Sequence, residues 1–449
     1  MSEVLRSVGL DLGTTSTQMV VSELTVENRA SGFAIPELEI TQRKILYKSP
    51  VHFTPLLDES RMDAPALRRL LEEEYRQAGI TRESVDTGAI IITGETSRKE
   101  NARAVLEALS DLAGDFVVTA AGPDLESVLA ARGAGAVAYS EQTGKTVLHM
   151  DIGGGTSNLA LIRDGKILRT GCLNAGGRLL KLDNAGVITY VSPVLASVSD
   201  LKPGDAPSES QLENLSQTLT QALEMAAGLR ESTSLLARLT TRETGRPWSP
   251  PEEPVVVSFS GGVADCIARD IPALAFGDIG PVLGRAIRGS RLCRGNYILG
   301  SETIRATVIG AGCHSAQLSG STVFHRNIRF PLKNLPAASY RTGVSLHSDS
   351  IPILTMEGLP SPTYPQIASL AEEIISRHPA PYYICTRQDM AKALGQALAA
   401  RLPADTPILC IDRVQVSEGS YLDVAAPVGS ALPVVVKTLI LSDNVRSML

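Results

Sequence analysis

Two aspartates, each followed at once by a turn of glycine and hydroxyl residues, are the residues of this chain best suited to chemistry. Asp11 opens the run Asp-Leu-Gly-Thr-Thr-Ser, and Asp151 opens the run Asp-Ile-Gly-Gly-Gly-Thr-Ser. Glycine leaves backbone N–H groups unobstructed, and these groups, with neighbouring hydroxyls, can hold phosphate oxygens. A carboxylate can hold Mg²⁺ directly or through its waters. Together the two runs predict that a nucleoside triphosphate is bound in a cleft, with one run contacting it from each side.

The segments around both turns have the same pattern, an apolar strand on either side. Residues 8–12 and 18–21 flank the first turn, and residues 147–152 and 157–162 flank the second. A third buried strand, residues 255–260, enters the pair Gly261-Gly262 and then a helix. One glycine turn alone is weak evidence, because glycine is a default turn residue. The order of all these motifs along one chain is what carries the prediction.

Composition narrows the class of protein. The chain has 449 residues, which suggests about three domains. Its net charge is −6 with scattered Lys and Arg, and aromatic residues make up 4%, which argues against a nucleic-acid partner. Six cysteines without a C-x-x-C pair favour reduced, buried thiols. No apolar run approaches the roughly 18 residues of a membrane span, and the N-terminus leads straight into a strand. We therefore expect no membrane association and a cytoplasmic location.

Apolar periodicity predicts a mixed α/β chain throughout. An amphipathic helix is indicated by Leu67, Leu70, Leu71 and Tyr75, with residues 72–74 (Glu-Glu-Glu) on its solvent side. The other expected elements are a strand at 40–45, a buried strand at 88–93, a helix at 101–112, a strand at 116–119, a helix at 124–138, one or two helices within 208–239, a helix within 302–318, and alternating short strands and helices from about 320, ending in a strand at 433–441.

Several tempting features have plainer explanations. The triplet 144–146 (Gly-Lys-Thr) is like the end of a P-loop, but it precedes a strand instead of opening a helix. Gly133-x-Gly135 is better explained by helix packing than by dinucleotide binding, since it does not follow a strand directly. His149, beside the expected magnesium site, is predicted to be a satisfied structural residue, and the pair Cys313-His314 part of a packed helix.

The ordered motifs resemble those of the actin-like ATPase superfamily, which includes the Hsp70 ATPase domain, actin and sugar kinases. The resemblance covers about residues 7–318 and implies an α/β, actin-like ATPase (ribonuclease H-like) fold, with two lobes around a nucleotide cleft and a C-terminal α/β extension. The two phosphate motifs of the superfamily correspond to residues 11–17 and 151–157, and its adenosine motif corresponds to residues 255–265. Its two connecting motifs, which cross at the hinge, correspond to helices around 131–138 and 307–316. The implied domains are 1–146 (lobe I, with an inserted subdomain), 147–318 (lobe II) and 319–449.

The resemblance implies ATP and Mg²⁺ as cofactors and assigns their contacts. Asp11 and Asp151 are the catalytic and metal-binding residues, which anchor hydrated Mg²⁺ and orient the attacking water. At the β-phosphate the resemblance places Gly13, Thr14, Thr15 and Ser16. At the γ-phosphate it places Gly153, Gly154, Gly155 and Thr156, and at adenosine Gly261 and Gly262.

Within the superfamily, the whole chain resembles the ethanolamine ammonia-lyase reactivating factors. The supporting runs are 8–18, 121–127, 151–158 and 434–439. This resemblance implies a chaperone-like ATPase that releases damaged cobalamin from ethanolamine ammonia-lyase so that intact adenosylcobalamin can enter. Adenosylcobalamin would be met only through the lyase, and the protein could associate with the ethanolamine-utilisation microcompartment. The resemblance leaves a homodimer open and assigns no role to residues 319–449.

One departure from the superfamily concerns hydrolysis. Hsp70-type members carry Asn-Glu-Pro before the first connecting helix, whereas this chain has Ala121-Gly122-Pro123, so Gly122 falls where the water-positioning Glu would be. Asp124 and Glu126 are the candidates to replace it. Two rival functions stay open: a small-molecule kinase on the same scaffold, for which no carboxylate base is identified, and an actin-like scaffold or filament protein.

Overall fold

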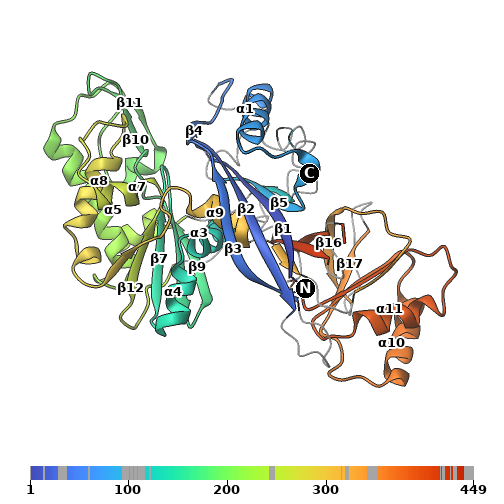
Figure 1. The fold of residues 1–449 in the computed structure, drawn as a ribbon. Helices are drawn as coiled ribbons and strands as arrows, with labels where there is room; N and C mark the ends of the chain where they lie inside the picture. Colours follow the sequence, from blue (N-terminus) through green and yellow to red (C-terminus); the bar gives the residue numbers. More distant parts are fainter. Residues whose placement is uncertain are drawn as a thin grey trace.

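The computed structural model shows two α/β lobes beside a third, C-terminal α/β domain (Figure 1). The residues that it describes are 2–13, 16–28, 38–58, 61–93, 101, 105, 109, 117–120, 123–241, 248–314, 316–318, 323–340, 351–414, 416, 420–424, 426–427 and 432–438. No helix within these residues is long and apolar enough to cross a membrane. The six cysteines form no disulfide among them, and five are buried.

The first sheet contains both flanks of the first glycine turn. Its strands run in the order β3-β2-β1-β5-β6, with β1, β2 and β3 antiparallel and β1, β5 and β6 parallel. The bounds are β1 (Ser2–Leu12), β2 (Ser16–Asn28), β3 (Leu38–Lys48), β5 (Thr87–Ile92) and β6 (Val117–Ala120), with β4 (His52–Phe53) paired to β2. Helix α1 (Ala64–Gln77), followed by a 3-10 turn at Arg82–Ser84, buries Leu67 and Leu71 in the core of this lobe.

The second sheet repeats the same plan around the second turn. Its order is β13-β12-β7-β8-β9, again with three antiparallel strands and two parallel neighbours. The bounds are β7 (Val147–Ile152), β8 (Ser157–Arg163), β9 (Lys166–Leu173), β12 (Val256–Ser260) and β13 (Tyr297–Leu299). This duplicated topology confirms the predicted two-lobed, actin-like α/β fold.

Helices and a small hairpin complete the second lobe. The predicted helical region 208–239 forms two helices, α5 and α6. The elements are β10 (Leu180–Leu182), β11 (Ile188–Val191), α5 (Glu209–Ala226), α6 (Ser234–Leu239), α7 (Gly262–Ala268) and α8 (Gly280–Arg288), with 3-10 turns at Pro193–Ser197 and Arg291–Cys293. They share one large apolar core with the sheet.

Two helices cross between the sheets (Figure 1). Helix α3 (Pro123–Gly133) packs on β8 and β9, and α9 (Ala306–His314) packs on β1 and β2. A Cβ on Gly133 would lie 1.9 Å from the Ala306 carbonyl oxygen, and one on Gly310 would lie 2.1 Å from that of Leu129. The crossing therefore requires glycine on both helices. The resemblance places the first connecting motif at 131–138, whereas the helix that crosses α9 is α3, at 123–133.

The C-terminal domain is an eight-stranded mixed sheet in the order β14-β21-β20-β16-β17-β18-β19-β15. Helices α10 (Tyr364–Arg377) and α11 (Ala391–Ala399) pack together beside it, and Arg401 pairs with Glu372 between them at 3.1 Å. The strands are β14 (Ala316–Leu318), β15 (Phe324–Arg326), β16 (Leu332–Ser339), β17 (Ile353–Met356), β18 (Tyr382–Thr386), β19 (Ile408–Asp412), β20 (Ser420–Val424) and β21 (Pro433–Thr438). The predicted alternation of short strands and helices holds from β17 to β19, whereas the described elements before and after it are strands.

Two local predictions need correction. The helix expected at 124–138 is two helices, α3 and α4 (Ala136–Thr143), because Gly135 has a φ of 81°. The helix expected within 302–318 is confirmed as α9, and residues 316–318, which follow it, pair with β21 as a strand. Most of the helix expected at 101–112 lies outside the described residues.

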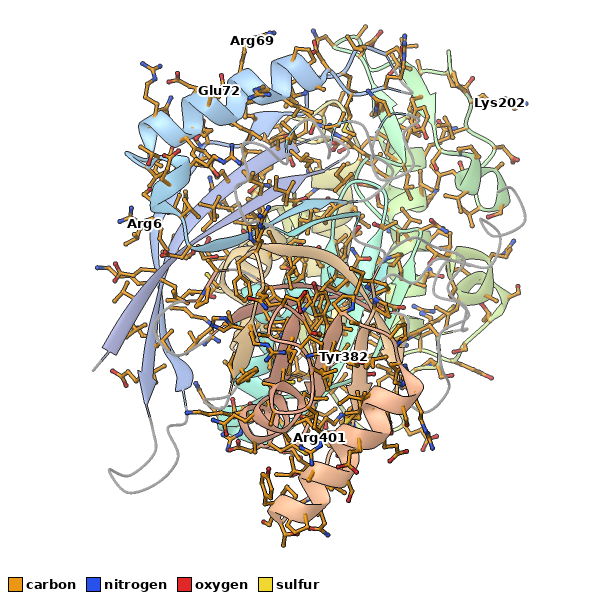
Figure 2. All side chains as sticks on the ribbon, turned by 90° about the vertical axis from the view of Figure 1, so that its right-hand side faces the viewer. Arg6, Arg69, Glu72, Lys202, Tyr382 and Arg401 are labelled. Carbon is orange, nitrogen blue, oxygen red and sulfur yellow. The ribbon has the colours of Figure 1, made fainter. Side chains whose placement is uncertain are left out.

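The second correction concerns Glu74, which was expected on the solvent side of α1. Arg69 and Glu72 do project outward (Figure 2), but Glu74 is 1% exposed. It lies three residues after Leu71, on the buried face of the helix. The carboxylate accepts hydrogen bonds from the Tyr47 hydroxyl at 2.7 Å and is 2.6 Å from His52 Nε2. Polar partners from β3 and β4 thus compensate its burial.

Candidate functional site

The two glycine turns are built alike. In the first hairpin Asp11 faces Gln18, and the N–H of Gly13 donates to the Ser16 carbonyl at 2.9 Å. In the second, Asp151 faces Asn158, and the N–H of Gly153 donates to the Thr156 carbonyl, also at 2.9 Å. Each turn is closed by the same hydrogen bond, and each aspartate faces an amide side chain.

The structure brings Asp11 and Asp151 close enough for their charges to interact. Burial raises the pKa of Asp11 to about 7; a 2.7 Å hydrogen bond from Thr93 Oγ1 opposes the rise, and the charges of Glu126 and Asp151 add to it. Burial raises the pKa of Asp151 to about 6, against hydrogen bonds from Ser260 and, at 3.5 Å, Thr307. Acidic groups with raised pKa values between two lobes are suited to bind a cation.

Glu126, at the start of α3, is a third carboxylate of this site. Its residue is 7% exposed, and Oε2 accepts a hydrogen bond from Asn158 Nδ2 at 2.7 Å. Asp124, the other candidate for the water-positioning role, accepts a hydrogen bond from Thr170 on β9. Only Glu126 of the two acts on the pKa of Asp11. Gly122 lies outside the described residues.

The polar atoms around the two aspartates fit a hydrated Mg²⁺. Gln18 Oε1 and Asn158 Oδ1 are buried and have no hydrogen-bond partner among the described residues, while the amide nitrogen of each is used. Such acceptor oxygens are suited to metal-bound water. The described residues contain no group of three or more His, Cys, Asp or Glu that could hold a metal. Mg²⁺ commonly binds one or two carboxylates and keeps several waters.

The glycine and hydroxyl residues described in the two turns are half-buried or exposed. In the first, Thr54 Oγ1 donates to the Gly13 carbonyl at 2.7 Å and Ser16 is half-buried, while Thr14 and Thr15 lie outside the described residues. In the second, Gly154 is exposed, Gly153 and Thr156 are half-buried, and a Cβ on Gly155 would meet nothing within 4 Å. The second turn therefore has room for a phosphate group.

Gly261 and Gly262 occupy different surroundings. Gly261 has a φ of 86°, and a Cβ there would lie 2.3 Å from the Ile152 carbonyl oxygen. Close packing of the end of β12 on the end of β7 is thus a sufficient reason for glycine at 261. At Gly262 the nearest atom to such a Cβ is Ile304 Cδ1, at 4.0 Å. Of the two glycines, Gly262 is thus the one with open space beside it.

Several polar residues of the site were missed from the sequence. Thr93 follows β5 and Ser260 ends β12, and each of these buried strands is parallel to a strand that carries an aspartate. That placement could have identified both residues from the sequence.

His149 is fully buried, with Nε2 2.9 Å from Ser260 Oγ and Nδ1 3.0 Å from Ser258 Oγ. Burial lowers its pKa to about 3, so it is a neutral, structural histidine as predicted.

The doubled sheet, the glycine-packed crossing helices and the facing acidic hairpins define a two-lobed protein with the actin-like ATPase fold. The family model described as "Ethanolamine utilisation protein EutA" matches residues 3–442. The chain belongs to this family, which confirms the resemblance found in the sequence.

Two curated relatives extend over nearly the whole chain. Both are named "Ethanolamine ammonia-lyase reactivase EutA", one from Salmonella typhimurium and one from Escherichia coli. Each is 39% identical, over 97% of this chain and 98% of the relative. A solved structure, a Ppx/GppA family member from Aquifex aeolicus, is similar over 69% of this chain and 97% of its own, with 14% identity and a TM-score of 0.43.

Proposed function

We propose that this chain binds ATP and Mg²⁺ between its two lobes and uses ATP to reactivate ethanolamine ammonia-lyase. In this role it releases damaged cobalamin from the lyase so that intact adenosylcobalamin can bind. The observation that carries the proposal is the meeting of Asp11 and Asp151, each on its own glycine turn, across two equivalent sheets. The names of the two full-length relatives support the choice of lyase.

Each of the three sheets belongs to a part of the chain with its own role in this function. Residues 1–146 and 147–318 form the two lobes of the nucleotide site, and residues 319–449 form the domain that docks on the lyase. Helix α3 precedes residue 146 in the chain but packs on β8 and β9, so it ties the first segment to the second sheet. The protein works in the cytoplasm, with or without a microcompartment around it.

The residues of the site divide into three roles. Asp11 and Asp151, with Gln18 Oε1 and Asn158 Oδ1 beside them, would hold hydrated Mg²⁺. When bound, Mg²⁺ neutralises phosphate charge as the phosphoryl group is transferred. Backbone N–H groups of the two turns hold the phosphates, and Glu126 orients water for attack.

Loss of the γ-phosphate removes contacts that span the two turns. The lobes are then free to rotate about the crossing of α3 and α9, where Gly133 and Gly310 allow close approach. This movement, transmitted to the C-terminal domain, opens the lyase. Positioning and electrostatics supply the catalysis, since phosphoryl transfer needs little covalent help.

The test uses lyase blocked with cyanocobalamin. Purified chain, adenosylcobalamin, ATP and Mg²⁺ are added together, and recovered ammonia-lyase activity is measured. We expect recovery only when both ATP and Mg²⁺ are present, and none with Asp11→Asn or Asp151→Asn proteins that keep their circular dichroism. Recovery at the wild-type rate by either variant would refute the assignment.

The same preparation separates the rival functions. ATP turnover without an added acceptor favours the reactivase, whereas turnover that requires a sugar or an acid favours a kinase. ATP-dependent light scattering by the chain alone would reveal filaments.

A further inference from the structure

Arg178 lies against the second glycine turn and has no role in the site described so far. Its backbone N–H donates to the Gly154 carbonyl at 2.6 Å, and that of Gly177 donates to the Gly153 carbonyl at 3.0 Å. A Cβ on Gly176 would lie 2.4 Å from the Gly154 carbonyl oxygen. Residues 176–178 are therefore held in register along the turn, with no space between the two backbones.

The side chain of Arg178 begins over the same turn. Its Cβ, Cγ and Cδ lie 3.3, 3.9 and 3.8 Å from the position that a Cβ on Gly154 would occupy. Glycine at 154 is thus what allows the apolar stem to lie on this face of the turn. The stem covers one face at Gly154, while the neighbouring Gly155 remains open.

Asp278 holds the guanidinium in one orientation. Arg178 Nε donates to Asp278 Oδ2 at 2.9 Å, and the backbone N–H of Gly280 donates to Asp278 Oδ1 at 2.9 Å. Asp278 is 6% exposed, whereas the Arg178 side chain is 26% exposed. The two terminal nitrogens of Arg178 make no hydrogen bond to the described residues, so their N–H groups remain available to a ligand.

The turns contain no positive side chain of their own. Neither 11–16 nor 151–156 includes Lys or Arg, so their backbone N–H groups would meet the phosphates without a full charge. A guanidinium with two unused nitrogens is well suited to phosphate oxygens. The second turn is the one that the resemblance to actin-like ATPases assigns to the γ-phosphate.

We propose that Arg178 contacts the γ-phosphate and makes the site prefer ATP to ADP, with Asp278 as its positioning residue. This inference rests on the proposed function and names the nucleotide-sensing residue of that site. ADP lacks the group that Arg178 meets, so removal of the guanidinium weakens ATP binding and leaves ADP binding nearly unchanged.

Isothermal titration of the full chain with a non-hydrolysable ATP analogue or ADP, each with Mg²⁺, tests the proposal. We expect Arg178→Gln to weaken analogue binding about 10- to 100-fold, as for one lost charge-assisted hydrogen bond or pair, and to change ADP binding less than about threefold. Arg413→Gln is the matched control, because Arg413 pairs with Asp389 at the same 2.9 Å but in the C-terminal domain. The Arg413→Gln protein should bind both the analogue and ADP with the affinities of the wild type.

A second variant distinguishes a loss of nucleotide binding from a loss of folding. Arg178→Gln leaves the buried Asp278 without its cation, which can destabilise the fold. The double variant Arg178→Gln/Asp278→Asn removes that charge and should show the same selective loss of analogue binding. An unchanged preference for the analogue, or an equal loss for both nucleotides, in the folded double variant would overturn the inference. If the wild type binds neither nucleotide, the proposed function fails first.

Discussion

Replacing Asp151 by asparagine should stabilise the ligand-free protein at pH 8 while it removes the function. Asp151 is 8% exposed, and burial raises its pKa from 3.8 to about 6. Since one pKa unit corresponds to about 1.4 kcal/mol, ionised Asp151 costs the folded state about 3 kcal/mol. Asparagine has the same shape and no charge, and its Oδ1 can still accept the hydrogen bond from Ser260.

The effect of the substitution depends on pH in a defined direction. The folded protein holds the Asp151 proton more tightly than the unfolded chain does, so the free energy of unfolding of the wild type falls as pH rises from about 4 to about 6. The variant lacks this fall. The stability gap should therefore be near zero at pH 4 and largest above pH 6.

Unfolding in urea, without nucleotide or metal, can be followed through Trp248. It is the one tryptophan of the chain, and its buried ring packs against Gly171 of β9 in the same lobe. We expect a higher midpoint for Asp151→Asn than for the wild type at pH 8 and equal midpoints at pH 4. Asp164→Asn, in an exposed turn, is the control and should change neither. A variant that is destabilised equally at both pH values would refute the burial argument.

Three further predictions concern turnover, packing and pH. Glu126→Gln should lower the rate of ATP hydrolysis at least tenfold with little change in ATP affinity, whereas Asp124→Asn, which faces β9, should not; steady-state kinetics distinguish them. Gly310→Ala should destabilise the fold by about 1–3 kcal/mol in urea unfolding, because its Cβ would meet the Leu129 carbonyl across the crossing helices, and wild-type stability would refute that packing. Mg²⁺-dependent ATP binding should weaken as pH falls below about 7, by up to tenfold per unit, because a proton then competes for Asp11; in calorimetry from pH 8 to pH 5, an onset only near pH 6, where Asp151 protonates, would show that Asp11 is remote from the metal.

Much of the fold follows from local patterns. The apolar runs around residues 11 and 151 each specify two strands and a tight turn, and both hairpins form as expected. Predictions failed where one residue or a distant partner decides the backbone. Gly135 splits one expected helix, because its φ of 81° interrupts the helical backbone between α3 and α4. Glu74 is buried because Tyr47 and His52 satisfy its carboxylate, and neither partner is near it in sequence.

The sequence by itself determined which residues could carry the chemistry, because carboxylates, glycines and hydroxyls in a short turn express their properties locally. Only the tertiary structure decided which groups meet. Thr93 reaches Asp11, Ser260 reaches Asp151, and Glu126 is linked to Asn158 through contacts between elements 32 to 109 residues apart. Burial in the shared site, and with it the raised pKa values of the two aspartates, arises only when both sheets and the crossing helices have packed together.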